Sequence, residues 1–202
     1  MLKQSLRTLG AFLSISCLTF LFLPLAVADD PQSAEAGSEM MDEWMKFAEP
    51  GPSHKHLERM VGTWNTVSTD FSTNPDQPIK AEGVAVFEMI MGGRFVKCDF
   101  KSDFGGMPMQ GMGLQGYDNK LKKYVGTWID NFGSGMMRSV GTYDEKTDTL
   151  TENSTGSSPM GEMKMKMVTK YKSKDKFQLT MYTTNPDGSE TKTMQIDYTR
   201  AK

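Results

Sequence analysis

Val61-Gly62-Thr63-Trp64 is a stretch that this chain uses three times, and it points to the fold. Val125-Gly126-Thr127-Trp128 repeats it residue for residue, and Val140-Gly141-Thr142-Tyr143 repeats it with tyrosine in place of tryptophan. Glycine inside a strand-forming run marks a bend, a bulge or a close backbone approach. A chain that curves its strands into a closed barrel needs such corners repeatedly. We therefore interpret the repeat as one geometric requirement met three times: a glycine bends the strand and an aromatic ring fills the interior.

Short strand-forming segments follow one another from Gly62 onward, without helical periodicity between them. Turn sequences such as Gly92-Gly93 and Asn185-Pro186-Asp187-Gly188 separate them. The expected strands are residues 62–71, 79–90, 94–102, 110–118, 123–130, 136–143, 148–155, 162–172, 176–184 and 189–200. About ten consecutive strands predict an all-β fold, a single antiparallel up-and-down β-barrel preceded by short N-terminal helices. A two-sheet sandwich is the alternative.

Residues 1–28 have the composition of a signal peptide. Lys3 and Arg7 form a basic start, an apolar run follows, and Ala26-Val27-Ala28 has the small-x-small pattern that signal peptidase cleaves. Cleavage after Ala28 predicts an exported protein, periplasmic or secreted, whose mature chain has no stable membrane insertion. An uncleaved membrane anchor is the alternative, because the apolar run is long for a signal peptide.

Residues 29–52 are predicted to form an acidic leader, up to Gly37, followed by a short amphipathic helix from Ser38 to Ala48. Within that helix Met40, Trp44 and Phe47 form one apolar stripe.

The barrel domain is expected to span residues 53–202. Pro50-Gly51-Pro52 ends the first helix, and a further helical turn or two is expected from Ser53 to Met60. Both helical pieces are expected to pack outside the barrel or to cap one of its ends.

Charge and cysteine content limit the possible partners. The chain has 23 basic and 25 acidic residues, so it has no basic footprint for nucleic acid. Its two cysteines are Cys17, inside the predicted signal peptide, and Cys98. The mature chain therefore keeps one thiol and forms no internal disulfide, so a packed core must stabilise it.

An ordered set of short motifs carries a family resemblance. The set is Pro50-Gly51-Pro52, His54-Lys55, Leu57, Gly62-Thr63-Trp64, Gly92-Gly93-Arg94-Phe95, Met107-Pro108-Met109, Gly111, Gly113, Gly116-Tyr117-Asp118-Asn119, Val125-Gly126-Thr127-Trp128-Ile129-Asp130, Gly135-Met136-Met137, Asp187-Gly188-Ser189-Glu190 and Tyr198-Thr199-Arg200. In this order and spacing the chain resembles the bacterial family called domain of unknown function 1579, which is often carried by exported proteins. That family has no established activity, so the resemblance implies no reaction.

The segment from Leu57 to Trp64 also resembles the opening of calycin and lipocalin barrels, in which a short helical turn precedes Gly-x-Trp on the first strand. This resemblance implies a calycin-like barrel. Its nitrobindin-like members bind haem through a histidine late in the chain. Here the only histidines are His54 and His56, ahead of the first strand, where we expect a solvated turn. The sequence therefore predicts no haem bound in that mode, and no other cofactor.

The chain has 18 methionines, which is many for its length, and two interpretations compete. Clustered thioethers select Cu(I), and the candidate ligands are Met107, Met109, Met112, Met163, Met165 and Met167. Residues two apart on a strand share a face, however, so Met163, Met165 and Met167 are also what a barrel interior would contain. Methionine also lines adaptable apolar pockets.

The favoured hypothesis is a non-enzymatic barrel that binds a small hydrophobic or amphipathic molecule. The residues expected to line or gate its interior are Trp64, Trp128, Tyr143, Met107, Met109 and Met112, with Arg94 or Arg138 as the polar anchor. No nucleophile lies in a recognisable catalytic motif, so we assign no catalytic residue. The alternatives are a methionine-rich periplasmic Cu(I)-binding protein and a filled barrel that contacts other proteins, for which the helix up to Ala48 is the candidate surface.

Two further questions stay open from the sequence. Arg94, Asp130, Arg138, Glu152 and Arg200 flank aromatic or glycine corners, and they point either into the barrel or to the surface at strand ends. The glycine- and methionine-rich run at residues 104–113 is either a mobile loop at the mouth of a cavity or a glycine-bent strand pair.

Overall fold

The computed structural model describes residues 31–202, and the predicted signal peptide lies outside the described residues. The chain divides between Met40 and Met41 into two units, of which the larger contains the barrel. Among residues 31–202, no helix is both long enough and apolar enough to span a membrane.

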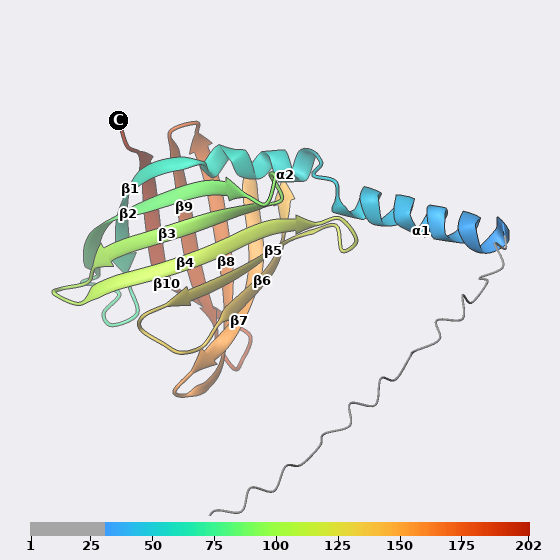
Figure 1. Ribbon diagram of the computed structural model, residues 1–202. Helices are drawn as coiled ribbons and strands as arrows, with labels where there is room; N and C mark the ends of the chain where they lie inside the picture. Colours follow the sequence, from blue (N-terminus) through green and yellow to red (C-terminus); the bar gives the residue numbers. More distant parts are fainter. Residues whose placement is uncertain (1–30) are drawn as a thin grey trace, which may run out of the picture. The chain divides into compact units, whose positions relative to one another are not determined.

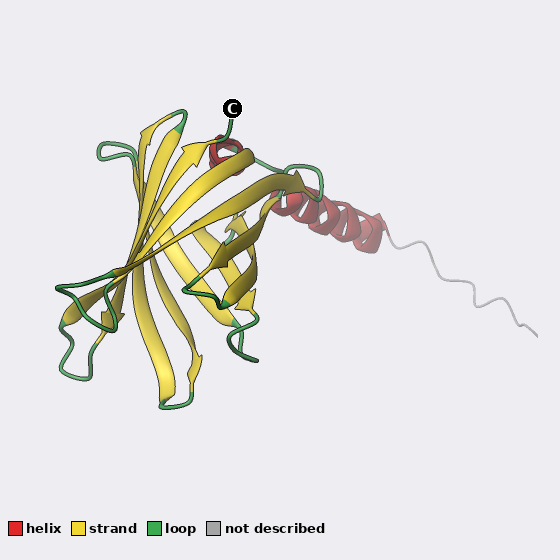
Figure 2. Cartoon of the chain, turned by 90° about the vertical axis from the view of Figure 1, so that its left-hand side faces the viewer, coloured by secondary structure: helices red, strands yellow, loops and turns green. Residues whose placement is uncertain are grey.

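Ten antiparallel strands form a closed barrel in the larger unit (Figures 1 and 2). They are β1 (Gly62–Asp70), β2 (Ile79–Ile90), β3 (Phe95–Asp103), β4 (Pro108–Asp118), β5 (Lys123–Asp130), β6 (Met137–Asp144), β7 (Thr149–Ser158), β8 (Gly161–Ser173), β9 (Lys176–Thr184) and β10 (Glu190–Arg200). Each strand pairs with the next, and β10 closes the ring by pairing with β1. The predicted up-and-down barrel is confirmed, and the two-sheet sandwich is wrong.

Two helices and a single 3₁₀ turn precede the barrel among the described residues: α1 (Pro31–Ala48), α2 (Pro52–Leu57) and η1 (Glu58–Met60). The helix expected from Ser38 begins at Pro31, so most of the expected leader is helical. Its apolar stripe is exposed rather than packed, with Trp44 61% and Phe47 43% accessible.

The segment α2–η1 packs its apolar side into the barrel core. Leu57 and Met60 are buried there, and the indole of Trp64 donates a hydrogen bond to the carbonyl oxygen of Met60 at 2.6 Å. Trp64 in turn contacts Phe177 edge to face, at 4.7 Å between ring centroids, and Phe177 stacks on Tyr198. This aromatic layer fills the barrel interior next to α2.

The two histidines are not in a solvated turn, and that prediction is wrong. His54 is 5% exposed, and its Nδ1 accepts a hydrogen bond from the Gly51 N–H at 3.0 Å. The His56 ring lies 4.0 Å from the Tyr143 ring and 5.1 Å from the Tyr171 ring, measured between centroids. His54 is buried and His56 half-buried because α2 folds back against the strands, a tertiary contact with no local sequence pattern.

Candidate ligand cavity

A cavity of about 310 Å³ lies inside the barrel, beyond the aromatic layer. Its lining includes Phe87, Phe177 and Tyr198 from that layer and reaches Phe104 in the β3–β4 loop. Seven methionines line it: Met60 from η1, and from the strands Met109, Met137, Met165, Met167, Met181 and Met194. A mainly apolar cavity of this size suits a small organic molecule.

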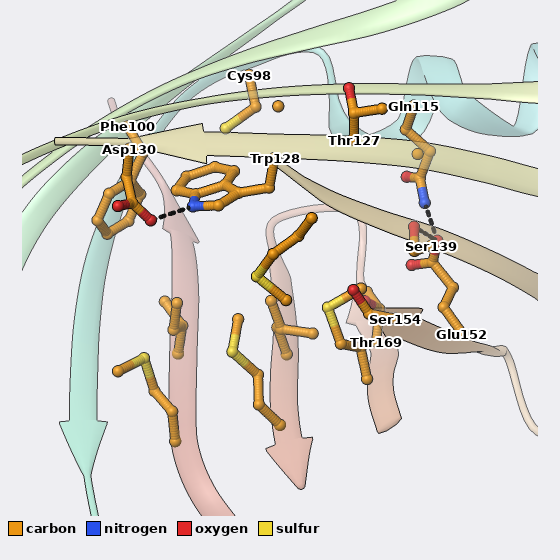
Figure 3. Close-up of a pocket in the computed structure, with 18 of the residues that line it drawn as sticks. Cys98, Phe100, Gln115, Thr127, Trp128, Asp130, Ser139, Glu152, Ser154 and Thr169 are labelled. Atoms are coloured by element: carbon orange, nitrogen blue, oxygen red, sulfur yellow. Dashed lines mark hydrogen bonds between the residues drawn. The ribbon is translucent and has the colours of Figure 1, made fainter. Parts of the chain in front are cut away.

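Trp128 forms one wall because β4 has glycines where its side chain lies. A Cβ atom added at Gly111 would overlap the indole ring, and one added at Gly113 would lie 3.1 Å from it. The indole N–H donates a hydrogen bond to Asp130 Oδ2 at 2.8 Å (Figure 3). The run at residues 104–113 is thus a short loop followed by a glycine-containing strand.

A polar cluster around Glu152 occupies the other side of the cavity, away from Trp128 (Figure 3). The Glu152 side chain is buried on β7, and its Oε1 accepts hydrogen bonds from Ser139 Oγ and Gln115 Nε2, both at 2.9 Å. Ser154 and Thr169 are also buried and line the cavity nearby. A few polar groups in an apolar pocket are the usual means of orienting a ligand.

Glycines from two copies of the repeated motif make room for this cluster. A Cβ atom added at Gly126 would lie 2.7 Å from Ser139 Oγ. One added at Gly141, which is paired with Glu152 across β6 and β7, would overlap both the Glu152 side chain and the carbonyl of Thr151. Any larger residue at these positions would displace the buried carboxyl group or its donor.

Burial raises the pKa of Glu152, while its hydrogen bonds from Ser139 and Gln115 act in the opposite direction. Within residues 31–202, no basic side chain hydrogen-bonds to Glu152 or lines the cavity. The empty cavity therefore disfavours the charged form of this carboxyl group relative to water.

Of the residues predicted to line or gate the interior, Trp128 and Met109 line the cavity. Trp64 and Tyr143 belong to the packing beside α2, outside the cavity lining. Met107 and Met112 are exposed.

The structure places neither predicted arginine anchor at the cavity. Arg94 lies in the β2–β3 turn, where its guanidinium donates to the Met91 carbonyl oxygen at 3.1 Å. Arg138 is exposed on β6, between the inward-facing Met137 and Ser139. Among the five charged candidates only the two carboxylates, Asp130 and Glu152, line the cavity.

The six candidate Cu(I) ligands are not brought together. Met109, Met165 and Met167 line the cavity, whereas Met107 and Met112 are exposed. Met163, on β8, lies outside the cavity lining. Among the described residues there is also no cluster of three or more histidine, cysteine, aspartate or glutamate side chains arranged to hold a metal ion.

Sequence reasoning missed Gln115 and Ser139, the donors to Glu152. Their only sequence marker is position: Gln115 is two residues from Gly113 and Tyr117, and Ser139 is two residues from Gly141, so each shares the inward face. The sequence therefore predicts that both side chains point into the barrel, but it does not predict that they join a polar cluster.

A family model described as a protein of unknown function (DUF1579) matches residues 49–200. The chain belongs to this family. The match spans α2 and all ten strands, so the family unit is the barrel with its adjoining short helix. A comparison with curated protein sequences found no match.

Solved structures similar to this DUF1579 protein are barrels. The crystal structure of Rv2717c from M. tuberculosis superposes with a TM-score of 0.56 at 14% identity, covering 76% of this chain and all of that one (100%). A redesigned β-barrel, mFAP1, bound to DFHBI, gives a TM-score of 0.40 at 18% identity, covering 71% of this chain and 97% of that one. At these identities the likeness to Rv2717c establishes the fold alone.

Proposed function

We propose that this DUF1579 protein is a non-enzymatic barrel that binds a small, mainly apolar molecule in its cavity. The observation that carries this proposal is a mainly apolar space of about 310 Å³ with a buried polar cluster at one side. Flexible methionine side chains adapt their shape to a ligand at little cost, which suits a binding cavity. The filled-barrel alternative expects no cavity, so the cavity counts against it.

The proposal includes export. Its support is the sequence of residues 1–28, and the mass of the protein purified from its native cells tests it. A mature chain beginning at Asp29 supports cleavage, whereas an intact N-terminus supports the anchor.

Cavity binding is tested by filling the space with a side chain. Ser154 is buried and faces the cavity, while its neighbour Thr155 on the same strand is exposed. Ser154→Phe is expected to abolish binding of octanol and of the neutral dye Nile red, and Thr155→Phe to leave both unchanged. Thermal shift and dye fluorescence measure the binding, and equal loss in the two variants would refute a site inside the barrel.

Tryptophan fluorescence provides a second measurement of the same binding. Trp128 lines the cavity, whereas Trp44 is exposed on α1. Ligand-induced quenching should disappear in Trp128→Phe and persist in Trp44→Phe. If no compound of a broad hydrophobic panel shifts the melting temperature or the fluorescence of the unmodified protein, the proposed function is wrong.

A further inference from the structure

The charges that line the cavity are all of one sign. The two carboxylate side chains Asp130 and Glu152 line it, and no lysine, arginine or histidine among residues 31–202 does. An anionic ligand group would therefore enter an uncompensated site of its own sign. The expected arginine anchor is replaced by an acidic one.

Glu152 has the hydrogen-bond pattern of a carboxylate that lacks a cation. Ser139 Oγ and Gln115 Nε2 both donate to Oε1, which stabilises negative charge on the group. No hydrogen bond to Oε2 occurs within the described part of the chain. An incoming ammonium group would supply the missing charge and donate to that second oxygen.

We propose that the cavity selects amphiphiles with a primary amine head, and that Glu152 is the residue that binds the amine. This inference rests on the proposed function and names the ligand class of the same cavity. The apolar body of the ligand would pack against the methionines and the rings of Phe100 and Trp128. A neutral acceptor head is a poorer fit, because it needs Glu152 to remain a donor while two groups donate to its other oxygen.

Binding would be coupled to proton release wherever Glu152 carries a proton in the empty cavity. Burial raises the pKa of Glu152 there, and the ligand enters as an alkylammonium ion, which lowers that pKa again. A proton held by Glu152 then leaves to solvent as the ammonium–carboxylate pair forms, and the net charge of the cavity stays the same. Removing either partner would leave a buried, uncompensated charge.

The test compares octylamine, octanol and octanoate, which share one apolar chain and differ in the head group. Isothermal titration calorimetry at neutral pH gives the affinities, and repeating it in buffers of different ionisation enthalpy counts the protons released. Octylamine is expected to bind about tenfold or more tightly than octanol, because a hydrogen bond to a charged group is stronger than a neutral one. Octanoate is expected to bind most weakly, and octylamine alone to release protons, up to one per molecule and more as the pH is lowered.

Glu152→Gln keeps the shape of the side chain and is expected to remove both the amine preference and the proton release, so that octylamine binds no more tightly than octanol. Glu162→Gln is the matched control, because Glu162 is an exposed carboxylate on the adjacent strand β8. Proton counting on the unmodified protein keeps the test valid if Glu152→Gln fails to fold.

Three results would overturn the inference. Octanol binding as tightly as octylamine, with no proton release, would refute amine selection while leaving the proposed function intact. An amine preference that survives in Glu152→Gln would place the anchor elsewhere. Failure of all three octyl compounds to bind would count against the proposed cavity function itself, and the inference would fall with it.

Discussion

Acid should destabilise this protein through His56. Comparison with a His56 variant should separate this effect from those of the other titrating groups. The His56 ring is packed among Tyr124, Tyr143 and Tyr171, and its Nε2 is buried with no hydrogen-bond partner within the described chain. Burial, and then the nearby positive charge of Arg59, lower the pKa of His56 to about 4. The folded protein therefore disfavours the protonated ring.

The direction and size of the effect follow from that shift. The lowered pKa means that the unfolded chain binds a proton on His56 more readily than the folded chain does. His56 then contributes fully to stability above pH 6.5, and this contribution is lost as the pH falls from 6.5 to about 4. One pKa unit is worth about 1.4 kcal/mol, so the free energy of unfolding should fall by roughly 3 kcal/mol across this interval as an upper bound.

Urea denaturation followed by near-ultraviolet circular dichroism, repeated between pH 4 and pH 8, measures the loss. His56→Gln has no charge to gain, so its stability should vary less with pH than that of the unmodified protein, by most of that amount. Asp148, the carboxylate that faces His56, is present in both proteins, so its contribution largely cancels in the difference between the two curves. Its lowered pKa also places its titration mostly below this interval. Parallel curves for the two proteins would refute the reasoning.

Two further outcomes are expected. Gly141→Ala should lower the free energy of unfolding by about 1–3 kcal/mol, because its methyl group would overlap Glu152 and the Thr151 carbonyl. Gly51→Ala is the control and should change the free energy of unfolding little, because a Cβ there has nothing within 4 Å. Equal urea midpoints for the two variants would contradict this. Burial raises the pKa of the Cys98 thiol to about 12, so a thiol reagent should modify it slowly until the protein unfolds, with Cys98→Ser as the blank; rapid modification of the folded protein would contradict its burial.

The strands could be predicted because turn sequences mark their ends and the alternation of apolar and polar residues shows which side chains point inward. Alternation in Met163-Lys164-Met165-Lys166-Met167 puts methionines on one face, and the structure places Met165 and Met167 at the cavity. The same phase rule excludes Arg138 as an anchor: Tyr143 and Met137 share the inward face of β6, so Arg138 must point outward. The outward orientation of Arg138 could therefore be predicted from the sequence.

The polar side of the cavity could not be predicted in the same way. In the β7 sequence Thr149-Leu150-Thr151-Glu152-Asn153-Ser154, both faces are polar beyond Leu150. Glu152 and Ser154 share a face with Leu150, but one apolar residue is weak evidence that this face is buried. The pairing of β7 with β6 shows that it is, since Gly141 and Ser139 face them. The burial of His54 and His56 depends likewise on the docking of α2, which is set by distant strands.

The aromatic residue of each Gly-Thr-aromatic copy packs in the core, as predicted. The glycines have two different structural roles, so the interpretation as one requirement met three times is wrong for them. At its first copy Gly62 has a φ of 122°, which disfavours other residues, and a Cβ there would lie 2.7 Å from the Arg200 guanidinium that covers the Trp64 ring. Gly126 and Gly141 instead have ordinary φ angles and leave space beside the inward-facing Ser139 and Glu152.

The glycine of the first copy therefore serves the end of the barrel against which α2–η1 packs. The glycines of the other two copies make room for polar side chains of the cavity. A buried carboxyl group without a cation lowers stability, so a barrel interior accommodates one only where space and hydrogen-bond donors are provided. Gly141 provides that space opposite Glu152, and Gly126 provides it opposite the donor Ser139. The motif that predicts the fold thus also makes room for the polar cluster around Glu152.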